Sequence, residues 1–445
     1  MVNFSNFHLF KHEPVQSKRG GLFPYPKDTR AECGIFAPMN AQIEHLYQIA
    51  QKPTRYIIGL MSGTSLDGLD VALCRISGSG SDTSASLVNF DTVPYSDALK
   101  EDIRAVFAKT EINFEHLCLL NPYIGRLHGE MILDCLTRWN IAPAEVDLVA
   151  SHGQTVFHAP KSATAARADG HARFPNATLQ IGDGDHVAAT TGIITLSDFR
   201  QKHVAHGGEG APLAVYGDYF MFSSVSENRI LLNLGGIANF TYLPKSGDTS
   251  DVFTTDTGPG NTLLDAYARL FTGKPYDENG QLSARGRVSD ELLTALLDHP
   301  FFDAPFPKTT GPEVFNPDYV QAAGQRSQTE TLSPEDLMAT LARFSAEAAA
   351  EAIRRVMQPQ EDYAVYLSGG GMHNPVLVSN LRALLPGCSF GRTDDLGIAG
   401  DAKEAVLFAV LANEAVAGGK TSFGNRHRRR TRVPSVTMGK ISFPK

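Results

Sequence analysis

The chain has 445 residues, of which 42% are hydrophobic and 20% are charged, as is usual for globular proteins, and the length suits two domains. Its formal net charge of −8 argues against a general nucleic-acid binder, and the lack of a long apolar run argues against a membrane span. The cysteines lack CxxC spacing and the first residues lack a secretory signal, so we expect free thiols in a cytoplasmic protein.

The first predicted elements are an irregular extension and a strand-turn-strand unit. Residues 1–55 mix proline, glycine and charge without periodicity, and no chemistry is expected of them. Strands are predicted at residues 56–60 and 69–76, and the glycine-rich loop MSGTSLDG joins them. No helix follows this loop, which distinguishes it from Walker-type and dinucleotide-binding loops.

This loop has groups that suit a polyphosphate. Gly63 and Gly68 allow tight turns, and Thr64 and Ser65 offer hydroxyls beside backbone N–H donors. The Asp67 carboxylate would repel phosphate unless a cation lies between them, so the loop predicts a divalent metal such as Mg²⁺. A polar β-hairpin turn without a ligand is the alternative.

Three more glycine loops follow strands in the second half of the chain. Residues 230–244 repeat the strand-turn-strand pattern, which indicates duplicated halves facing each other across a cleft. Residues 253–261 are predicted as a loop that places Asp256 near two glycines, and residues 365–375 combine a buried strand with SGGG. Loops at strand ends are where α/β folds bind ligands.

Further strands and helices alternate along the chain. The remaining strands are predicted at residues 86–95, 146–150, 193–196, 230–234, 240–243 and 364–367. Ser333 and Pro334 predict the start of a helix, after which apolar residues recur at three- and four-residue steps. Two more helices are predicted at residues 376–385 and 403–417.

This alternation predicts an α/β fold with two domains around a central cleft. We place the domains at residues 56–225 and 226–420, and a basic segment and tail at residues 421–445. The basic run at residues 426–432 is short in an acidic chain, so we interpret it as a solvated loop rather than a nucleic-acid patch.

Polar residues at two further strand ends are candidates for chemistry. His152 and Gln154 follow a predicted strand; a lone histidine there is more often structural, whereas the amide of Gln154 suits a sugar hydroxyl. Asp198 ends an apolar strand beside a glycine segment, which suits a general base. Pairing with Arg200 or helix capping is an equal alternative for this carboxylate.

Three other residues are weaker candidates. Asp183 and Asp185 compete for the role of base, although their glycine-rich turn favours side-chain hydrogen bonds within the turn. Lys308, in KTTG, offers a cation that could meet phosphate or sugar.

Taken together, the motifs resemble the anhydro-N-acetylmuramic acid kinase family of bacterial cell-wall recycling. The resemblance spans residues 56–437 and rests on the stretches GLMSGTSLDGLDVALC, ASHGQTVFHAP, TLQIGDGDHVAATTGI, SDFR, GGEGAPL, NLGGIANFTYLP, DTGPGN, PKTTG, SGGGMHN, DAKEAVLFAVLANEAVAGG and PSVT. The family belongs to the actin-like ATPase superfamily, so the resemblance implies two ribonuclease H-like domains that close on ATP.

The resemblance also implies an unusual reaction. Water opens the 1,6-anhydro ring at C1 while O6 takes the γ-phosphoryl group of ATP, which gives N-acetylmuramic acid 6-phosphate and ADP. The SDFR motif carries the base that activates water, and this role maps onto Asp198. Positioning and charge neutralisation by glycine loops and Mg²⁺ suit phosphoryl transfer.

The remaining site residues follow from the glycine loops and the resemblance. The resemblance assigns the ATP phosphates to Gly63, Thr64, Ser65, Leu66, Asp67, Gly68, Leu69 and Asp70. The other loops are predicted to complete the ATP cleft with Gly235, Gly236, Asn239, Gly258, Gly260, Gly369, Gly370 and Gly371. Weaker predictions are metal contacts by Asp67 and Asp256 and substrate contacts by His152, Gln154 and Arg200.

Two other functions stay open at this point. Levoglucosan kinase opens the same bicyclic linkage and shares most of these motifs, so another anhydro sugar is an alternative substrate. A non-catalytic ATP-gated binding protein is the alternative from a different class, although Asp198 argues against it. A small-molecule anhydro sugar is the predicted partner, without nucleic acid or membrane, and a homodimer is the assembly to test.

Overall fold

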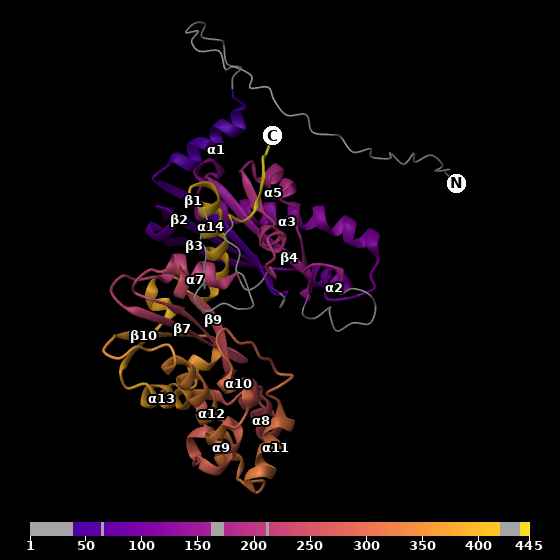
Figure 1. The fold of residues 1–445 in the computed structure, drawn as a ribbon. Coiled ribbons are helices and arrows are strands. Elements are labelled where there is room, and N and C mark those ends of the chain that lie inside the picture. Colours follow the sequence, from indigo (N-terminus) through magenta and orange to yellow (C-terminus); the bar gives the residue numbers. More distant parts are fainter. Residues whose placement is uncertain (1–38, 64–65, 162–172, 211–212, 419–436) are drawn as a thin grey trace, which may run out of the picture. The chain divides into compact units, whose positions relative to one another are not determined.

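A computed structural model describes residues 39–63, 66–161, 173–210, 213–418 and 437–445. The chain falls into two compact units, residues 1–44 and residues 45–445, and the second contains both sheets (Figure 1). Among the described residues, no helix has the length and apolar character that a membrane crossing needs.

The described part of the segment predicted to be irregular, residues 39–55, contains the helix α1 (Ala41–Gln51). Asn40 starts it, because its side-chain oxygen accepts hydrogen bonds from the N–H groups of Gln42 and Ile43. Ile49 is fully buried. The prediction of irregular structure is therefore wrong for these residues, where a local cap and one apolar anchor suffice to form a helix.

The first sheet has seven strands in the order β12-β6-β4-β1-β2-β3, with β5 paired to β4. Its strands are β1 (Thr54–Ser62), β2 (Gly68–Ser77), β3 (Ser84–Pro94), β4 (Leu148–Ala159), β5 (Ala177–Ile181), β6 (Thr195–Ser197) and β12 (Lys440–Ser442). The hairpin partner β2 is antiparallel to β1 and β3, whereas β4 runs parallel to β1 and β6. The carboxyl ends of β1, β4 and β6 therefore meet at one edge.

The second sheet repeats this order with five strands, β11-β10-β7-β8-β9. They are β7 (Asn228–Leu234), β8 (Ile237–Leu243), β9 (Phe253–Pro259), β10 (Tyr363–Ser368) and β11 (Cys388–Arg392). The hairpin partner β8 is antiparallel to β7 and β9, as β2 is to its neighbours in the first sheet, and β10 runs parallel to β7 and β11. The predicted class, an α/β fold with two ribonuclease H-like halves, is confirmed by this repeated topology.

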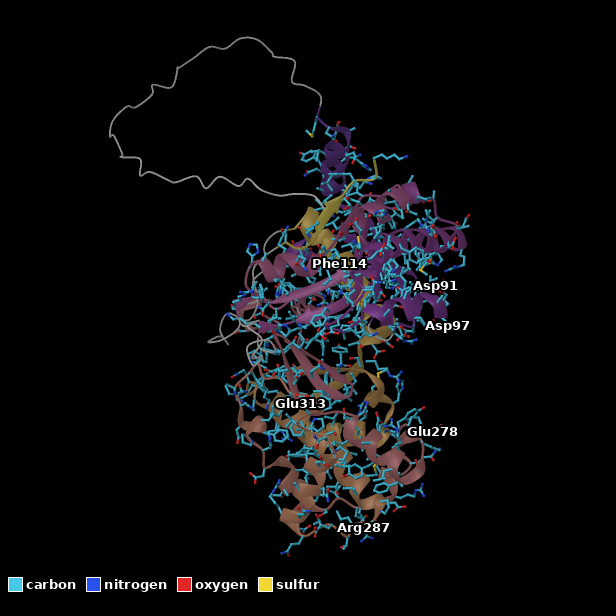
Figure 2. The ribbon with its side chains drawn as sticks, turned by 90° about the vertical axis from the view of Figure 1, so that its right-hand side faces the viewer. Asp91, Asp97, Phe114, Glu278, Arg287 and Glu313 are labelled. Atoms are coloured by element: carbon cyan, nitrogen blue, oxygen red, sulfur yellow. The ribbon has the colours of Figure 1, made fainter. Side chains whose placement is uncertain are left out.

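Helices cover the faces of both sheets (Figure 1). The helices after α1 are α2 (Asp97–Val106), α3 (Phe114–Trp139), α5 (Gly184–Thr191), α6 (Phe199–Ala205), α7 (Ala214–Phe222), α8 (Thr262–Thr272), α9 (Asp290–Leu297), α10 (Pro300–Asp303), α11 (Pro317–Ser327), α12 (Pro334–Arg354), α13 (Pro375–Leu384) and α14 (Lys403–Val416). Figure 2 labels Asp91 in β3 of the first sheet and Asp97 at the start of α2, with Glu278 and Arg287 among the helices beside the second sheet.

The first sheet is buried on both faces, which explains the continuous apolar run of β1. Ile57 packs in one hydrophobic cluster with α14, whereas Ile58 and Leu60 pack in another cluster with α3. Successive side chains of a strand point to opposite faces, so a strand covered on both sides must be apolar throughout. The last long helix of the chain thus lies on the first sheet.

Two predicted strands and one predicted loop differ from the observed elements. β4 continues to Ala159, so His152 and Gln154 lie inside a strand and do not follow one; Gly153, with a φ of 74°, forms part of an irregularity opposite the end of β1. The strand predicted at residues 193–196 is observed as β6, and most of the loop predicted at residues 253–261 is β9. Its glycines belong to a strand that pairs with β8.

The helix predicted from Ser333 is confirmed as α12. The Ser333 side chain accepts a hydrogen bond from the Asp336 N–H at 3.1 Å, and Pro334 occupies the first turn. The predicted helices at residues 376–385 and 403–417 are likewise observed as α13 and α14.

Candidate active site

The first glycine loop forms a hairpin between β1 and β2, as predicted. Thr64 and Ser65 lie outside the described residues. Leu66 adopts a left-handed backbone with a φ of 59°. Its side chain is buried with that of Leu69 in the hydrophobic cluster between the first sheet and α3. The side chains of these two leucines anchor the hairpin, so a ligand there would meet only their backbone groups.

Gly68 allows a close approach of the hairpin to the end of β3. A Cβ atom at Gly68 would lie 3.1 Å from the Cα of Pro94, and the Tyr95 N–H donates to the Asp67 carbonyl oxygen at 3.1 Å. Asp70, which begins the straight part of β2, accepts a hydrogen bond from the Thr92 hydroxyl at 2.6 Å. The described part of the hairpin is therefore held by β3 and by the backbone of Tyr95.

A buried chain of hydrogen bonds supports the base of this hairpin. The Ser62 hydroxyl donates to the Gln154 side-chain oxygen at 2.5 Å, and the Tyr95 hydroxyl donates to Ser62 at 2.8 Å. The Tyr95 hydroxyl also lies 2.8 Å from His128 Nε2. Gln154 is fully buried, so its observed contacts are with the hairpin, while the predicted sugar contact stays a prediction.

His152 is engaged with Arg200. The Arg200 Nε–H donates to His152 Nε2 at 2.9 Å, and Nη1 donates to the Gly210 carbonyl oxygen at 2.6 Å. Burial and, to a smaller extent, the positive charge of Arg200 lower the pKa of His152 to about 3. His152 is therefore neutral, and it orients a guanidinium that lines a cavity.

The three glycine loops of the second sheet lie together, as the sequence predicts for strand ends of one sheet. The Gly260 N–H donates to the Gly236 carbonyl oxygen at 2.9 Å, and the Asn261 N–H donates to that of Gly235 at 2.8 Å. A Cβ atom at Gly369 would lie 2.6 Å from the Asn233 side-chain oxygen. Such close backbone packing requires glycine at these positions.

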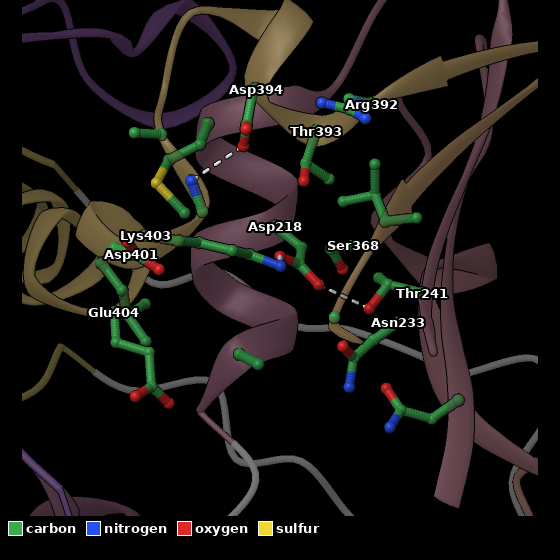
Figure 3. Close-up of a pocket in the computed structure, with 18 of the residues that line it drawn as sticks. Asp218, Asn233, Thr241, Ser368, Arg392, Thr393, Asp394, Asp401, Lys403 and Glu404 are labelled. Carbon is green, nitrogen blue, oxygen red and sulfur yellow. Dashed lines mark hydrogen bonds and ion pairs between the residues drawn. The ribbon is translucent and has the colours of Figure 1, made fainter. Parts of the chain in front are cut away.

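A cavity of about 830 Å³ opens beside these loops (Figure 3). Among the predicted residues, Arg200, Asn239, Gly369 and Gly370 line it, together with Met61 at the end of β1. The cavity thus reaches from the first sheet to the second. Its other walls come from strands β7, β8, β9 and β11 of the second sheet, from α7, from the segment before α14, and from the first half of α14.

An ion pair crosses one wall of this cavity. Lys403 Nζ lies 2.7 Å from Asp218 Oδ1, and the Thr241 hydroxyl donates to Asp218 Oδ2 at 2.6 Å (Figure 3). These residues belong to α14, α7 and β8. Because Asp218 is only 3% exposed, its charge requires these partners.

A second cavity of about 470 Å³ shares Gly370 with the first. It is also lined by Asn261, just before α8, by Asp265 in the first turn of α8, by Tyr276, and by Asn374 before α13. The aromatic ring and the amides suit a planar heterocycle with hydrogen-bonding edges.

Asp256 and Lys308 lie on neighbouring segments, and neither residue lines the large cavity. Asp256 accepts a hydrogen bond from the Thr310 N–H at 2.9 Å, and burial raises the pKa of its carboxyl. Lys308 Nζ donates to the carbonyl oxygens of Phe301 and Phe302 at 2.8 and 2.9 Å, and burial lowers its pKa to about 8. The Lys308 ammonium is therefore occupied by backbone and aromatic rings, which argues against the predicted phosphate or sugar contact.

The predicted base, Asp198, lies at the end of β6. Its backbone is left-handed, with a φ of 58°, and its side chain makes no capping hydrogen bond to α6. Its carboxylate is bonded to Lys440, whereas Arg200 turns toward His152. Both alternatives considered for this carboxylate, pairing with Arg200 and helix capping, are thus wrong. The competing Asp183 caps α5 by accepting from the Asp185 N–H at 2.8 Å.

Comparison with known proteins now adds to this geometry. The sequence profile described as Anhydro-N-acetylmuramic acid kinase matches residues 55–425. The chain belongs to the anhydro-N-acetylmuramic acid kinase family. A relative with this name from Pseudoalteromonas atlantica is 55% identical over 408 residues, which cover 91% of this chain and 100% of the relative. Another from Caldanaerobacter subterraneus is 37% identical over 404 residues, covering 90% and 100%. The prediction of a kinase is confirmed.

Sequence reasoning missed several cavity residues of this anhydro-N-acetylmuramic acid kinase family member. They include Asp218, Asn233, Thr241, Arg392, Lys403 and Glu404. One of them left a signal in the sequence: Asp218 is a lone carboxylate in the apolar segment AVYGDYFMF, and a charge inside such a helix requires a partner. Its partner, Lys403, is far away along the chain and could not be found by local pattern.

We expect the free energy of unfolding to fall as the pH drops from 6.5 toward 4. Burial lowers the pKa of His128 to about 4 and that of His152 to about 3, so the unfolded chain binds protons that the folded protein excludes. The contribution of these two histidines to the free energy of unfolding is fully present above about pH 6.5, the pKa of histidine in the unfolded chain. At pH 5 each histidine should lower the free energy of unfolding by about 2 kcal/mol. Urea unfolding at pH 7.5 and at pH 5 can measure this change.

The matched variants for this test are His128→Gln and His206→Gln. The first keeps a neutral partner for the Tyr95 hydroxyl but cannot titrate, so it should lose less stability on acidification than the wild type. His206 is exposed, so the stability of His206→Gln should depend on pH as that of the wild type does. An unchanged pH dependence in His128→Gln would contradict the assignment of acid sensitivity to this histidine.

Proposed function

We propose that this protein is an ATP-dependent kinase that hydrolytically opens 1,6-anhydro-N-acetylmuramic acid and phosphorylates O6. The observation that carries the proposal is the family match over residues 55–425, combined with a cavity bordered by glycine loops and by the end of β1. The products are N-acetylmuramic acid 6-phosphate and ADP, which places the enzyme in peptidoglycan recycling and amino-sugar catabolism.

The hairpin and the three glycine loops are proposed to hold the phosphates of ATP. Backbone N–H groups of glycine turns bind phosphate oxygens well because no side chain blocks them. The smaller cavity lined by Tyr276 and Asn374 is proposed to take the adenine and ribose, since it adjoins Gly370 and Gly371. The phosphates then meet backbone N–H groups, and the adenine and ribose meet an aromatic ring and amides.

The carboxylates beside the hairpin fit a divalent cation. Burial raises the pKa of the Asp70 carboxyl, a hydrogen bond from Thr92 lowers it, and the neighbouring Asp67 and Asp401 carboxylates raise it again. Such mutual repulsion is relieved when a cation is bound, and oxygen ligands suit Mg²⁺. Asp67 and Asp70 are therefore proposed to hold Mg²⁺, which neutralises phosphate charge. Asp256 lies in β9 of the second sheet, apart from this pair, and is the weaker candidate.

In the proposed reaction, Asp198 accepts a proton from water as the water oxygen bonds to C1 of the sugar. The bond between C1 and O6 breaks, and O6 bonds to the γ-phosphorus while the bond from that phosphorus to the ADP oxygen breaks. The neutral His152 fixes Arg200 at the cavity, where its charge can face an anionic group of a substrate. This chain therefore supplies a base, an oriented cation and phosphate loops.

Sugar-dependent ADP release tests the proposal. Purified protein with Mg·ATP should release ADP when 1,6-anhydro-N-acetylmuramic acid is added, and much less with levoglucosan. Preference for levoglucosan would favour a kinase for another anhydro sugar, and no release with either would favour an ATP-gated binding protein. We further propose a cytoplasmic enzyme with domains at residues 56–225 and 226–420, and a homodimer that light scattering can test.

A further inference from the structure

The short C-terminal strand β12 brings a lysine to the predicted base. It pairs antiparallel with β6, and Lys440 stands opposite Ser197 in the register. Asp198 follows Ser197 directly. Lys440 Nζ donates a hydrogen bond to Asp198 Oδ2 across this end of the pair. Two residues separated by most of the chain thus share one edge of the first sheet.

The backbone on both sides of Lys440 is fixed by packing. Met438 is 2% exposed and lies in the same hydrophobic cluster as Phe199, and Ser442 is buried at the other end of β12. Gly439 turns the chain into the strand with a φ of 98°, and a Cβ atom there would lie 3.3 Å from the Phe199 ring. The fold therefore determines where the Lys440 side chain starts, although that side chain is itself 65% exposed.

Asp198 has the backbone of a residue that its surroundings constrain. A left-handed conformation is uncommon for residues other than glycine, and such residues gather at functional sites. Among the described residues, the carboxylate has one hydrogen-bond partner, Lys440. The nearby cation on α6, Arg200, is directed to His152 and Gly210. Lys440 is therefore the cation that contacts this carboxylate.

We propose that Lys440 is a positioning residue for Asp198, an inference that rests on the proposed function. By engaging Oδ2, Lys440 leaves Oδ1 to accept the proton of the attacking water. An ion pair this exposed contributes little to folding stability, so replacing Lys440 should leave the fold intact.

The test replaces Lys440 and separates kcat from stability. Lys440→Met should lower the kcat of sugar-dependent ADP release by about 10- to 100-fold, because the base loses its orientation. The KM for ATP and the thermal unfolding midpoint should stay at wild-type values. Lys440→Arg, which keeps a donor and a charge, should restore most of the kcat. Lys445→Met, on the same tail, is the matched control and should leave all three quantities unchanged.

A double-mutant cycle with Asp198→Asn shows whether Lys440 acts through the base. In the Asp198→Asn background, Lys440→Met should cause no further loss of kcat, since the carboxylate that it orients is gone. An equal fractional loss in both backgrounds, or wild-type kcat in Lys440→Met, would overturn the inference while the wild type still turns over. A wild type without sugar-dependent ADP release would instead overturn the proposed function, and this inference with it.

Discussion

Asp198→Asn is expected to lower the kcat of sugar-dependent ADP release by about 10²- to 10⁴-fold, with ATP affinity unchanged. The amide has the size of the carboxylate but cannot take a proton from water. The fold should tolerate the change, because asparagine accepts a left-handed backbone as readily as aspartate does, and its oxygen can still accept from Lys440. The loss should therefore report chemistry and not unfolding.

Steady-state kinetics and calorimetric titration with a non-hydrolysable ATP analogue measure the two quantities. Asp185→Asn is the matched control, since Asp185 is an exposed carboxylate on the neighbouring α5 and was the competing candidate. It should keep the kcat of the wild type. Near-native turnover in Asp198→Asn would remove this residue as the base and reopen the search among other carboxylates.

The sequence predicted the local parts of this structure well. Strand-turn-strand units at β1-β2 and β7-β8 have alternating apolar and glycine-rich segments, and the capping serine of α12 is a signal contained in a few residues. The duplication of these units also predicted the two halves. Each of these features depends on neighbours in the sequence, so one chain suffices to read it.

The features that were missed depend on distant contacts. HGQT looked like a loop because it is polar and contains glycine, yet it lies in β4, where Ser62 bonds to the buried Gln154 and Arg200 to the buried His152. The pairing of β12 with β6 is equally remote, since the two strands lie at separate places in the chain. No local pattern predicts that a C-terminal lysine reaches Asp198.

The return of α14 to the first sheet is the third distant contact, and Gly59 makes it close. Gly59 lies within β1, and a Cβ atom there would overlap the carbonyl oxygen of Ala405 and lie 2.8 Å from its carbonyl carbon. It would also lie 3.0 Å from the Ala409 nitrogen. Glycine alone lets the helix backbone rest directly on the strand.

Gly59→Ala should therefore lower the free energy of unfolding by about 3 kcal/mol, because backbone atoms of a packed helix cannot yield as a flexible side chain would. Urea unfolding measures the change, with Gly387→Ala as the control, since a Cβ atom there would meet nothing within 4 Å. The first turn of α14 carries Lys403 into the cavity wall, so displacing the helix should also weaken ATP binding. Wild-type stability and ATP affinity in Gly59→Ala would contradict this explanation. The close packing of α14 on β1 would then not be what holds Lys403, and its ion pair with Asp218, at the cavity.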